Sequence, residues 1–165
     1  CGASHQQLEA EVTGQGYRGY DMTHHCHNTL WVVGKSESVL AAKHALLLEP
    51  ESTKPVLDFG LLLPPPSSLL PAKRNKAFTQ ALKRWRVRHW STESNGVLTH
   101  MVESETALQW QLTTLWSPPV KVYQALATHW PDLNCVYHYH NSKACLWGLA
   151  WYQDGLWATH ETMYG

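Results

Sequence analysis

Apolar positions along the chain recur with two different periods, and these predict strands and helices in a definite order. Residues 29–33 are β-branched and aromatic and precede Gly34, which predicts a buried strand. Ser36 is expected to cap the next helix, in which apolar residues recur at three- and four-residue steps up to Pro50. The chain is therefore predicted to begin its core with a strand followed by an amphipathic helix.

Proline dominates the next segment, because residues 50–71 hold six of the nine prolines. Proline fixes φ and removes a hydrogen-bond donor, so regular structure is not expected there. The segment also contains Leu57, Phe59 and the leucines at 61–63, which are too apolar for a solvated linker. We expect these side chains to pack across the domain rather than to separate two domains.

A second helix is predicted over residues 72–84, where apolar side chains share one face. A strand is predicted over residues 85–90, because large and charged side chains alternate in it. The alternation would place Trp85, Val87 and His89 on one face and Arg86, Arg88 and Trp90 on the other.

The second half of the chain has the most regular patterns. Residues 91–105 are polar with a turn at Asn95-Gly96, and residues 108–116 alternate strictly, as in a half-buried strand. Ser117 and Pro118 are expected to begin a helix that Pro131 ends. Strands at 134–140, 145–152 and 156–160 complete a hairpin or meander. The order predicts an α+β domain with an antiparallel sheet and two or three helices on one face.

Several short runs carry a family resemblance: Trp116-Ser117-Pro118-Pro119, Trp130-Pro131-Asp132-Leu133, the strand end Leu146-Trp147-Gly148, and upstream Asn28-Thr29-Leu30 and Asp58-Phe59. From about residue 22 to 155 the chain resembles the YubB-type ferredoxin-like family of phage and plasmid proteins. The family's Trp-Gly-Thr-Lys-Trp pattern appears only as Arg86-Val87-Arg88-His89-Trp90. The resemblance implies a ferredoxin-like fold and carriage on mobile DNA, with no established activity or catalytic residues.

Length and composition suit one domain. The 165 residues are 44% hydrophobic, and 13 basic residues balance 13 acidic ones, so no net field attracts a polyanion or a membrane. We expect residues 22–165 to form the domain and residues 1–21 to be an extension. No apolar run reaches about 18 residues, and the four cysteines form no C-x-x-C pair, so we expect free thiols, no membrane span and a cytoplasmic location.

The charge distribution suggests one contact surface. Seven of the thirteen basic residues lie between Ala72 and Trp90 with no acid among them: Lys73, Arg74, Lys76, Lys83, Arg84, Arg86 and Arg88. Guanidinium groups beside Trp90 could bind phosphates while the indole stacks on an unpaired base, which points to single-stranded nucleic acid. The alternative is a solvated face balanced by Glu93, Glu103 and Glu105.

Histidines and cysteines suggest two weaker sites. The tract His24-His25-Cys26-His27 together with His138 and His140 could hold zinc, although its spacing matches no known zinc motif. Nucleophilic catalysis would need Cys135 or Cys145 beside one of those histidines, but Cys135 and His138 should point to opposite faces of their strand. We therefore expect no catalytic residues, no bound metal and no cofactor.

The tryptophans in strand-like sequence, Trp110, Trp116, Trp147 and Trp151, are expected to be mostly core. If some are exposed, they form a protein-binding patch instead. The sequence thus predicts a non-enzymatic accessory binding protein, with single-stranded nucleic acid as the partner. The alternative is a module that binds a host protein or forms a homodimer through a sheet edge.

Overall fold

The computed structural model describes residues 25–52, 55–70 and 75–163. The expected extension, residues 1–21, lies outside them, as do His24, Lys73 and Arg74. The elements in chain order are β1 (His25–Val33), α1 (Ser36–Leu46), β2 (Leu47–Leu48), β3 (Val56–Leu57), the 3-10 turns η1 (Phe59–Leu61) and η2 (Ser67–Leu69), α2 (Lys76–Trp90), β4 (Val97–Ser104), β5 (Ala107–Leu115), α3 (Val120–His129), β6 (Asn134–Asn141), β7 (Leu146–Gln153) and β8 (Leu156–Met163).

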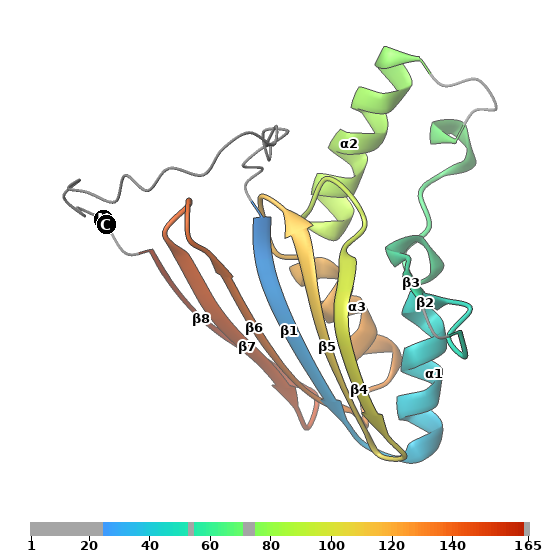
Figure 1. The fold of residues 1–165 in the computed structure, drawn as a ribbon, viewed down its shortest axis with the longest axis vertical. Coiled ribbons are helices and arrows are strands. Elements are labelled where there is room, and N and C mark those ends of the chain that lie inside the picture. The colour runs from blue at the N-terminus through green and yellow to red at the C-terminus, as the bar shows by residue number, and fades with distance from the viewer. Residues whose placement is uncertain (1–24, 53–54, 71–74, 164–165) are drawn as a thin grey trace, which may run out of the picture.

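The described strands form a six-stranded sheet in the order β4-β5-β1-β6-β7-β8, beside a two-residue ladder of β2 and β3. Every neighbouring pair in the large sheet is antiparallel. Figure 1 shows the three α-helices on the same side of this sheet. The predicted α+β architecture, with helices on one face and a C-terminal meander, is confirmed. Among the described helices, none has the length and apolar character needed to cross a bilayer.

The core lies between the helices and the inner face of the sheet. In β1, alternate residues point inward, so that Cys26, Leu30 and Val32 are fully buried while their neighbours face the other way. From the helices, the largest buried side chains are Trp90 and Tyr123, which pack in the same cluster. The core therefore forms where every second residue of the strands packs against the residues that recur every three or four positions on the helices.

A buried asparagine joins β1 to both of its neighbours in the sheet, β5 and β6. The Asn28 amide on β1 donates to the Cys26 carbonyl at 2.8 Å and to Thr114 Oγ1 on β5 at 3.1 Å. Its side-chain oxygen accepts a hydrogen bond of 2.8 Å from the Tyr137 hydroxyl on β6. Thr114 in turn donates to the Ser117 carbonyl at 2.8 Å. Because these buried polar groups satisfy one another, the network stabilises one register of the central strands.

The prediction of a strand at residues 85–90 is wrong. Those residues are the last part of α2, which ends at Trp90. The capping residue Ser91 has a left-handed φ of 68°, and its N–H donates to the Val87 carbonyl. The strand that precedes β5 is instead β4, in the segment that we expected to be polar loop. Sequence alternation was misleading here because the packing of an aromatic helix face against η1 and η2 favours the helix.

Two predicted helix caps are also wrong. Lys35 rather than Ser36 precedes the first turn of α1, and α3 begins after Pro119 rather than after Ser117. The Ser117 hydroxyl donates to the Ser91 carbonyl instead, which joins the start of α3 to the end of α2. Within the proline-rich connection, Leu57 and Phe59 are buried as expected, but Leu61 is exposed.

Candidate functional site

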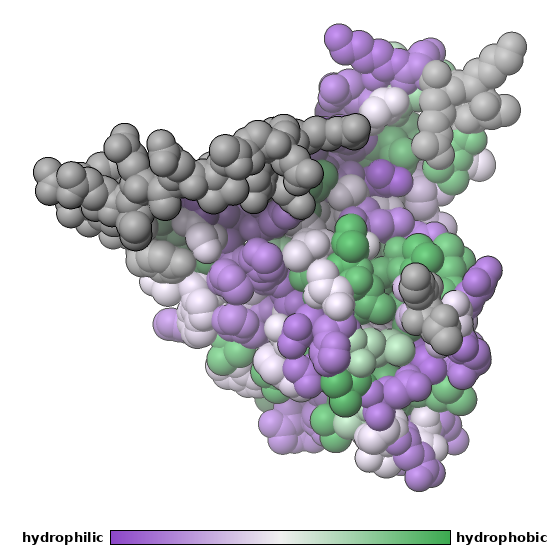
Figure 2. All heavy atoms as spheres, viewed as in Figure 1, coloured by the Kyte–Doolittle hydropathy of each residue, from purple (hydrophilic) through white to green (hydrophobic). Residues whose placement is uncertain are grey.

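The basic residues predicted as one strand face are distributed around helix α2. Lys76, Arg84 and Arg88 are exposed, and Figure 2 shows hydrophilic residues along the outer side of this helix. A helix turns by about 100° per residue, so Arg86 and Arg88 cannot share a face as they would on a strand. The Lys83 ammonium pairs with Glu93 at 2.7 Å, as the solvated-face alternative proposed.

Trp90 cannot serve as a stacking platform, because its side chain is only 1% exposed. Its indole Nε1 donates to the Leu63 carbonyl at 2.9 Å, and its ring meets Phe59 edge-on at 5.7 Å. The Arg86 guanidinium lies over the Trp90 ring, 5.0 Å from its centroid. These contacts fix the indole in the core, which contradicts the predicted role of Trp90 in binding a base.

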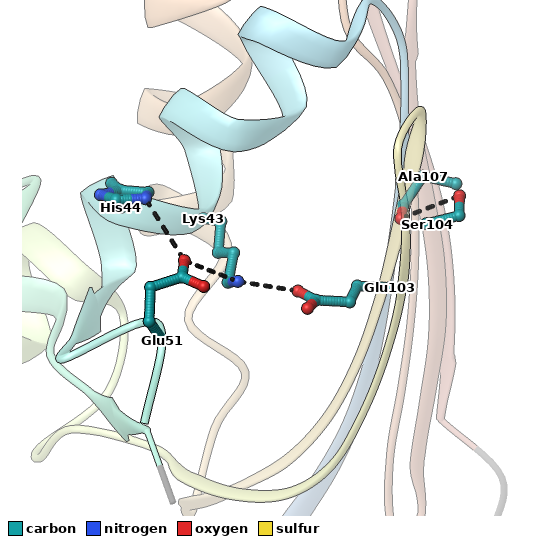
Figure 3. Close-up of polar contacts among 6 residues, drawn as sticks. All are labelled: Lys43, His44, Glu51, Glu103, Ser104 and Ala107. Carbon is teal, nitrogen blue, oxygen red and sulfur yellow. Dashed lines mark hydrogen bonds and ion pairs between the residues drawn. The ribbon is translucent and has the colours of Figure 1, made fainter. Parts of the chain in front are cut away.

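A hollow of about 440 Å³ lies between α1 and the β4–β5 turn, and Lys43 is its central polar group. Figure 3 shows the Lys43 ammonium between two carboxylates, with Glu103 at 2.9 Å and Glu51 at 3.1 Å. The hydrogen bond to Glu103 raises the pKa of Lys43, so this buried amine stays protonated and is neither a base nor a nucleophile. Glu103 thus joins α1 to β4, rather than balancing the cations of α2.

The thiols offer no activated nucleophile in the core. Burial raises the pKa of Cys26 and of Cys135 to about 12. The reactive form of cysteine is the thiolate, so both side chains should be inert in the folded protein. Cys135 is buried on the inner face of β6 and His138 lies on the outer face, as predicted from their spacing. Among the described residues, no three His, Cys, Asp or Glu side chains are placed to hold a metal ion.

We expect a thiol reagent to distinguish these cysteines. At about pH 8, the reagent should label Cys145 within minutes, because this residue is only partly buried in the β6–β7 turn. Cys26 and Cys135 should be labelled only after unfolding, as measured by peptide mass spectrometry with and without denaturant. Equal labelling of Cys135 and Cys145 in the native protein would contradict the burial of Cys135.

No described element covers the sheet face opposite the helices. Strand register places Trp31, Val136 and Trp151 side by side on β1, β6 and β7, because Trp31 pairs with Val136 and Val136 with Trp151. Their exposed fractions are 37%, 42% and 41%. Val102 on β4 extends the same row beyond Gln109 of β5. We call this outer side of the six-stranded sheet the open face, and these four apolar residues its apolar row.

The open face has an unusual charge pattern. None of the described residues that the register places on it is Asp, Glu, Lys or Arg, but it holds six of the eleven histidines. The His27 and His140 rings stack at 5.0 Å, and Trp147 lies 5.6 Å from His138 and 6.1 Å from His160. The six are His25, His27, His100, His138, His140 and His160. The described residues of the open face thus form an aromatic surface that carries no Asp, Glu, Lys or Arg.

The expectation that the four strand tryptophans are mostly core is wrong for three of them. Trp110 is fully buried, but Trp116 is 51% exposed, and Trp147 and Trp151 lie on the open face. Sequence reasoning also missed Trp31 and Val136 as surface residues. The signal was present in β1, where His25 and His27 share a period-two set with Trp31, so that set had to be the outer one.

Comparison with known proteins finds a family match in the second half of the chain. Residues 89–163 match the family model described as a ferredoxin-like domain in Api92-like protein. No curated protein and no solved structure matches the chain. The matched range runs from the end of α2 through β8, and so includes α3 and five of the six strands of the sheet. Over this range the chain is similar to an uncharacterised family, and the predicted ferredoxin-like fold is confirmed.

Proposed function

We propose that this protein is a non-enzymatic binding protein that uses the open face to bind the surface of another protein molecule. The observation that carries this proposal is the apolar row, in which two tryptophans and two valines are exposed on a face whose described residues include no Asp, Glu, Lys or Arg. Contiguous exposed apolar residues of this kind mark interaction sites in soluble proteins.

The chemistry of the open face favours a protein partner over nucleic acid. The cores of protein interfaces are depleted in charged residues and enriched in aromatic ones, as this face is. Nucleic-acid binding draws most of its affinity from lysines and arginines that neutralise phosphates, and the open face has neither. Its glutamines and threonines, such as Gln111 and Thr113, can supply the polar contacts of an interface.

Helix α2 supports a second candidate function, binding of single-stranded nucleic acid. Its fifteen residues include five cations and no acid, and Lys76, Arg84 and Arg88 are exposed. These side chains can contact phosphates, but with Trp90 in the core the surface lacks the aromatic platform on which bases stack. The open face is therefore the better supported surface.

Photo-cross-linking in cells tests the proposed function. A photoreactive amino acid placed at position 136 should give a discrete protein adduct, and the same amino acid at position 87 should not. Val87 is a matched control because it is 48% exposed, against 42% for Val136, and lies on α2. In a quantitative binding assay with the identified partner, Val136→Glu should weaken binding at least about tenfold, since it buries an unpaired charge, and Val87→Glu should not.

Two results would contradict this function. One is adducts of equal yield from positions 136 and 87. The other is salt-sensitive binding of fluorescent single-stranded DNA or RNA that Arg84→Glu with Arg88→Glu abolishes and Val136→Glu leaves unchanged. The second result would assign function to α2.

The setting of this function is also proposed. The Trp116-Ser117-Pro118-Pro119 run supports membership of the YubB-type branch and carriage on mobile DNA. A cytoplasmic location is supported by the free thiols of Cys26 and Cys135 in the described part of the chain.

A further inference from the structure

We infer that the partner of the open face is a second copy of this chain, docked face to face, and that protonation of the histidines separates the two copies. This inference rests on the proposed function of the open face and adds both the identity of the partner and its control by pH.

The size of the open face suits a stable dimer. Strands lie about 4.8 Å apart and rise about 3.3 Å per residue, so six strands of about eight residues span roughly 29 Å by 26 Å, or about 750 Å². The lengths of β1 and β4–β8 are eight or nine residues each. A standard specific interface buries about 800 Å² on each partner, so one open face covers what a dimer needs.

The layout of the open face is self-complementary. A dimer with two-fold symmetry must place a surface against itself. Because β1 and β6 are the two central strands, a two-fold axis along the strands sets Trp31 of one copy against Val136 of the other. The same two-fold operation places the stacked His27 and His140 rings of one copy against the same pair in the other copy. Apolar side chains thus meet apolar side chains, and histidine rings meet histidine rings.

Charge also favours a second copy at neutral pH. Two identical faces repel one another when they hold fixed charges of one sign. The open face has no Asp, Glu, Lys or Arg, so two copies do not repel one another through such charges. A different partner would be selected through complementary charges, which this face does not offer. Neutral histidines are compatible with docking, since each ring can donate one hydrogen bond and accept another.

The histidines make the docking sensitive to acid. On the open face, β1 presents His25 and His27, β6 presents His138 and His140, and β4 and β8 present His100 and His160. The outer residues of β5 and β7 are not titratable. The turns at the rim add Lys143 near the His27 end and Lys35, Glu105, Asp132 and Asp154 at the opposite end.

The direction of the pH effect follows from linkage. Desolvation, and then the nearby His140 and His25, already lower the pKa of His27 in the single copy. A second copy would remove more water and bring further histidines close, so docking lowers the pKa of His27 further. A group whose pKa falls on docking favours the docked state above its free pKa. Association should therefore be strong above about pH 7 and be lost as the pH falls below about 6.5, the ordinary histidine value, because the pKa of His27 is already lowered in the single copy.

Sedimentation equilibrium of the full chain at equal ionic strength tests this inference. We expect a dimer at about pH 8 and a monomer at about pH 5.5, on either side of the ordinary histidine pKa. Val136→Glu should be monomeric at both values, and Val87→Glu should behave as the wild type. His27→Gln with His140→Gln, which removes the stacked pair, should keep the dimer to lower pH.

Each remaining outcome overturns part of the inference. A monomer at about pH 8 and roughly 100 µM, well above typical dissociation constants, removes the second copy as partner. In that case, adducts from position 136 to a different protein would leave the proposed function standing. A dimer that persists at acid pH removes the histidine control. A dimer that tolerates Val136→Glu places the contact elsewhere, as at the edge strands β4 or β8.

Discussion

Replacing Trp90 with alanine is expected to lower the free energy of unfolding by about 3–5 kcal/mol, the usual cost of deleting a buried indole. The ring is 1% exposed, lies edge-on to Phe59 and donates to the Leu63 carbonyl at 2.9 Å. Alanine would leave a cavity where α2 packs on η1 and would orphan a carbonyl of the proline-rich connection. Urea denaturation followed by circular dichroism measures the change.

Two further variants separate the contributions to this loss. Trp90→Phe keeps most of the apolar volume but removes the donor, so it should cost less than alanine, about 1–2 kcal/mol. Val87→Ala, at an exposed position of the same helix, should change stability by no more than about 0.5 kcal/mol. If Trp90→Ala were as mild as Val87→Ala, Trp90 would not be a core residue, and its role as a base-stacking side chain would be restored.

The position of Trp90 shows where the sequence pattern was ambiguous. Residues 85–90 alternate charged and aromatic side chains, which is typical of a strand. However, Phe78, Leu82 and Trp90 also continue a helical spacing of four and eight residues. No glycine or proline separates them, so nothing in the sequence ends the helix before Ser91. Because residues 85–90 fit both the strand period and the helix period, the pattern alone could not decide between them. The absence of a helix stop signal was the better guide.

Other elements were predictable because only one period fits them. β5 alternates without interruption, and β7 and β8 flank the turn Gln153-Asp154-Gly155, where Gly155 has a left-handed φ of 80°. Their order and the α+β class followed from local patterns alone. β4 was not predicted, since its inner positions, such as Leu98 and Met101, are interrupted by a bulge that breaks the alternation.

The open face could not be assigned from individual strands. Aromatic side chains point to both faces of the sheet, with Trp110 inward and Trp151 outward. The sequence of one strand therefore does not show which of its two alternating sets of residues is buried. The decision depends on all three helices lying on one side, which is a property of the whole chain. The inward set of β1 even includes Asn28, which a pattern of apolar positions would place outside.

Replacing Asn28 with alanine is expected to cost about 2–4 kcal/mol, since it orphans several buried polar groups at once. The Tyr137 hydroxyl, which donates to Asn28 at 2.8 Å, would lose its acceptor, and the Cys26 carbonyl would lose its side-chain donor. Burial raises the pKa of Tyr137 well above its ordinary value, so the hydroxyl keeps its proton and still needs an acceptor. Chemical denaturation at neutral pH measures the loss.

A double-mutant cycle shows whether this cost comes from the network or from lost volume. Tyr137→Phe removes the hydroxyl, so Asn28→Ala combined with Tyr137→Phe should cost at least about 0.5–1 kcal/mol less than the sum of the single changes. The reason is that removing both partners of a buried hydrogen bond leaves no unsatisfied group. Additive single changes would mean that Asn28 and Tyr137 do not act together. The central strands would then be held by packing and backbone pairing alone.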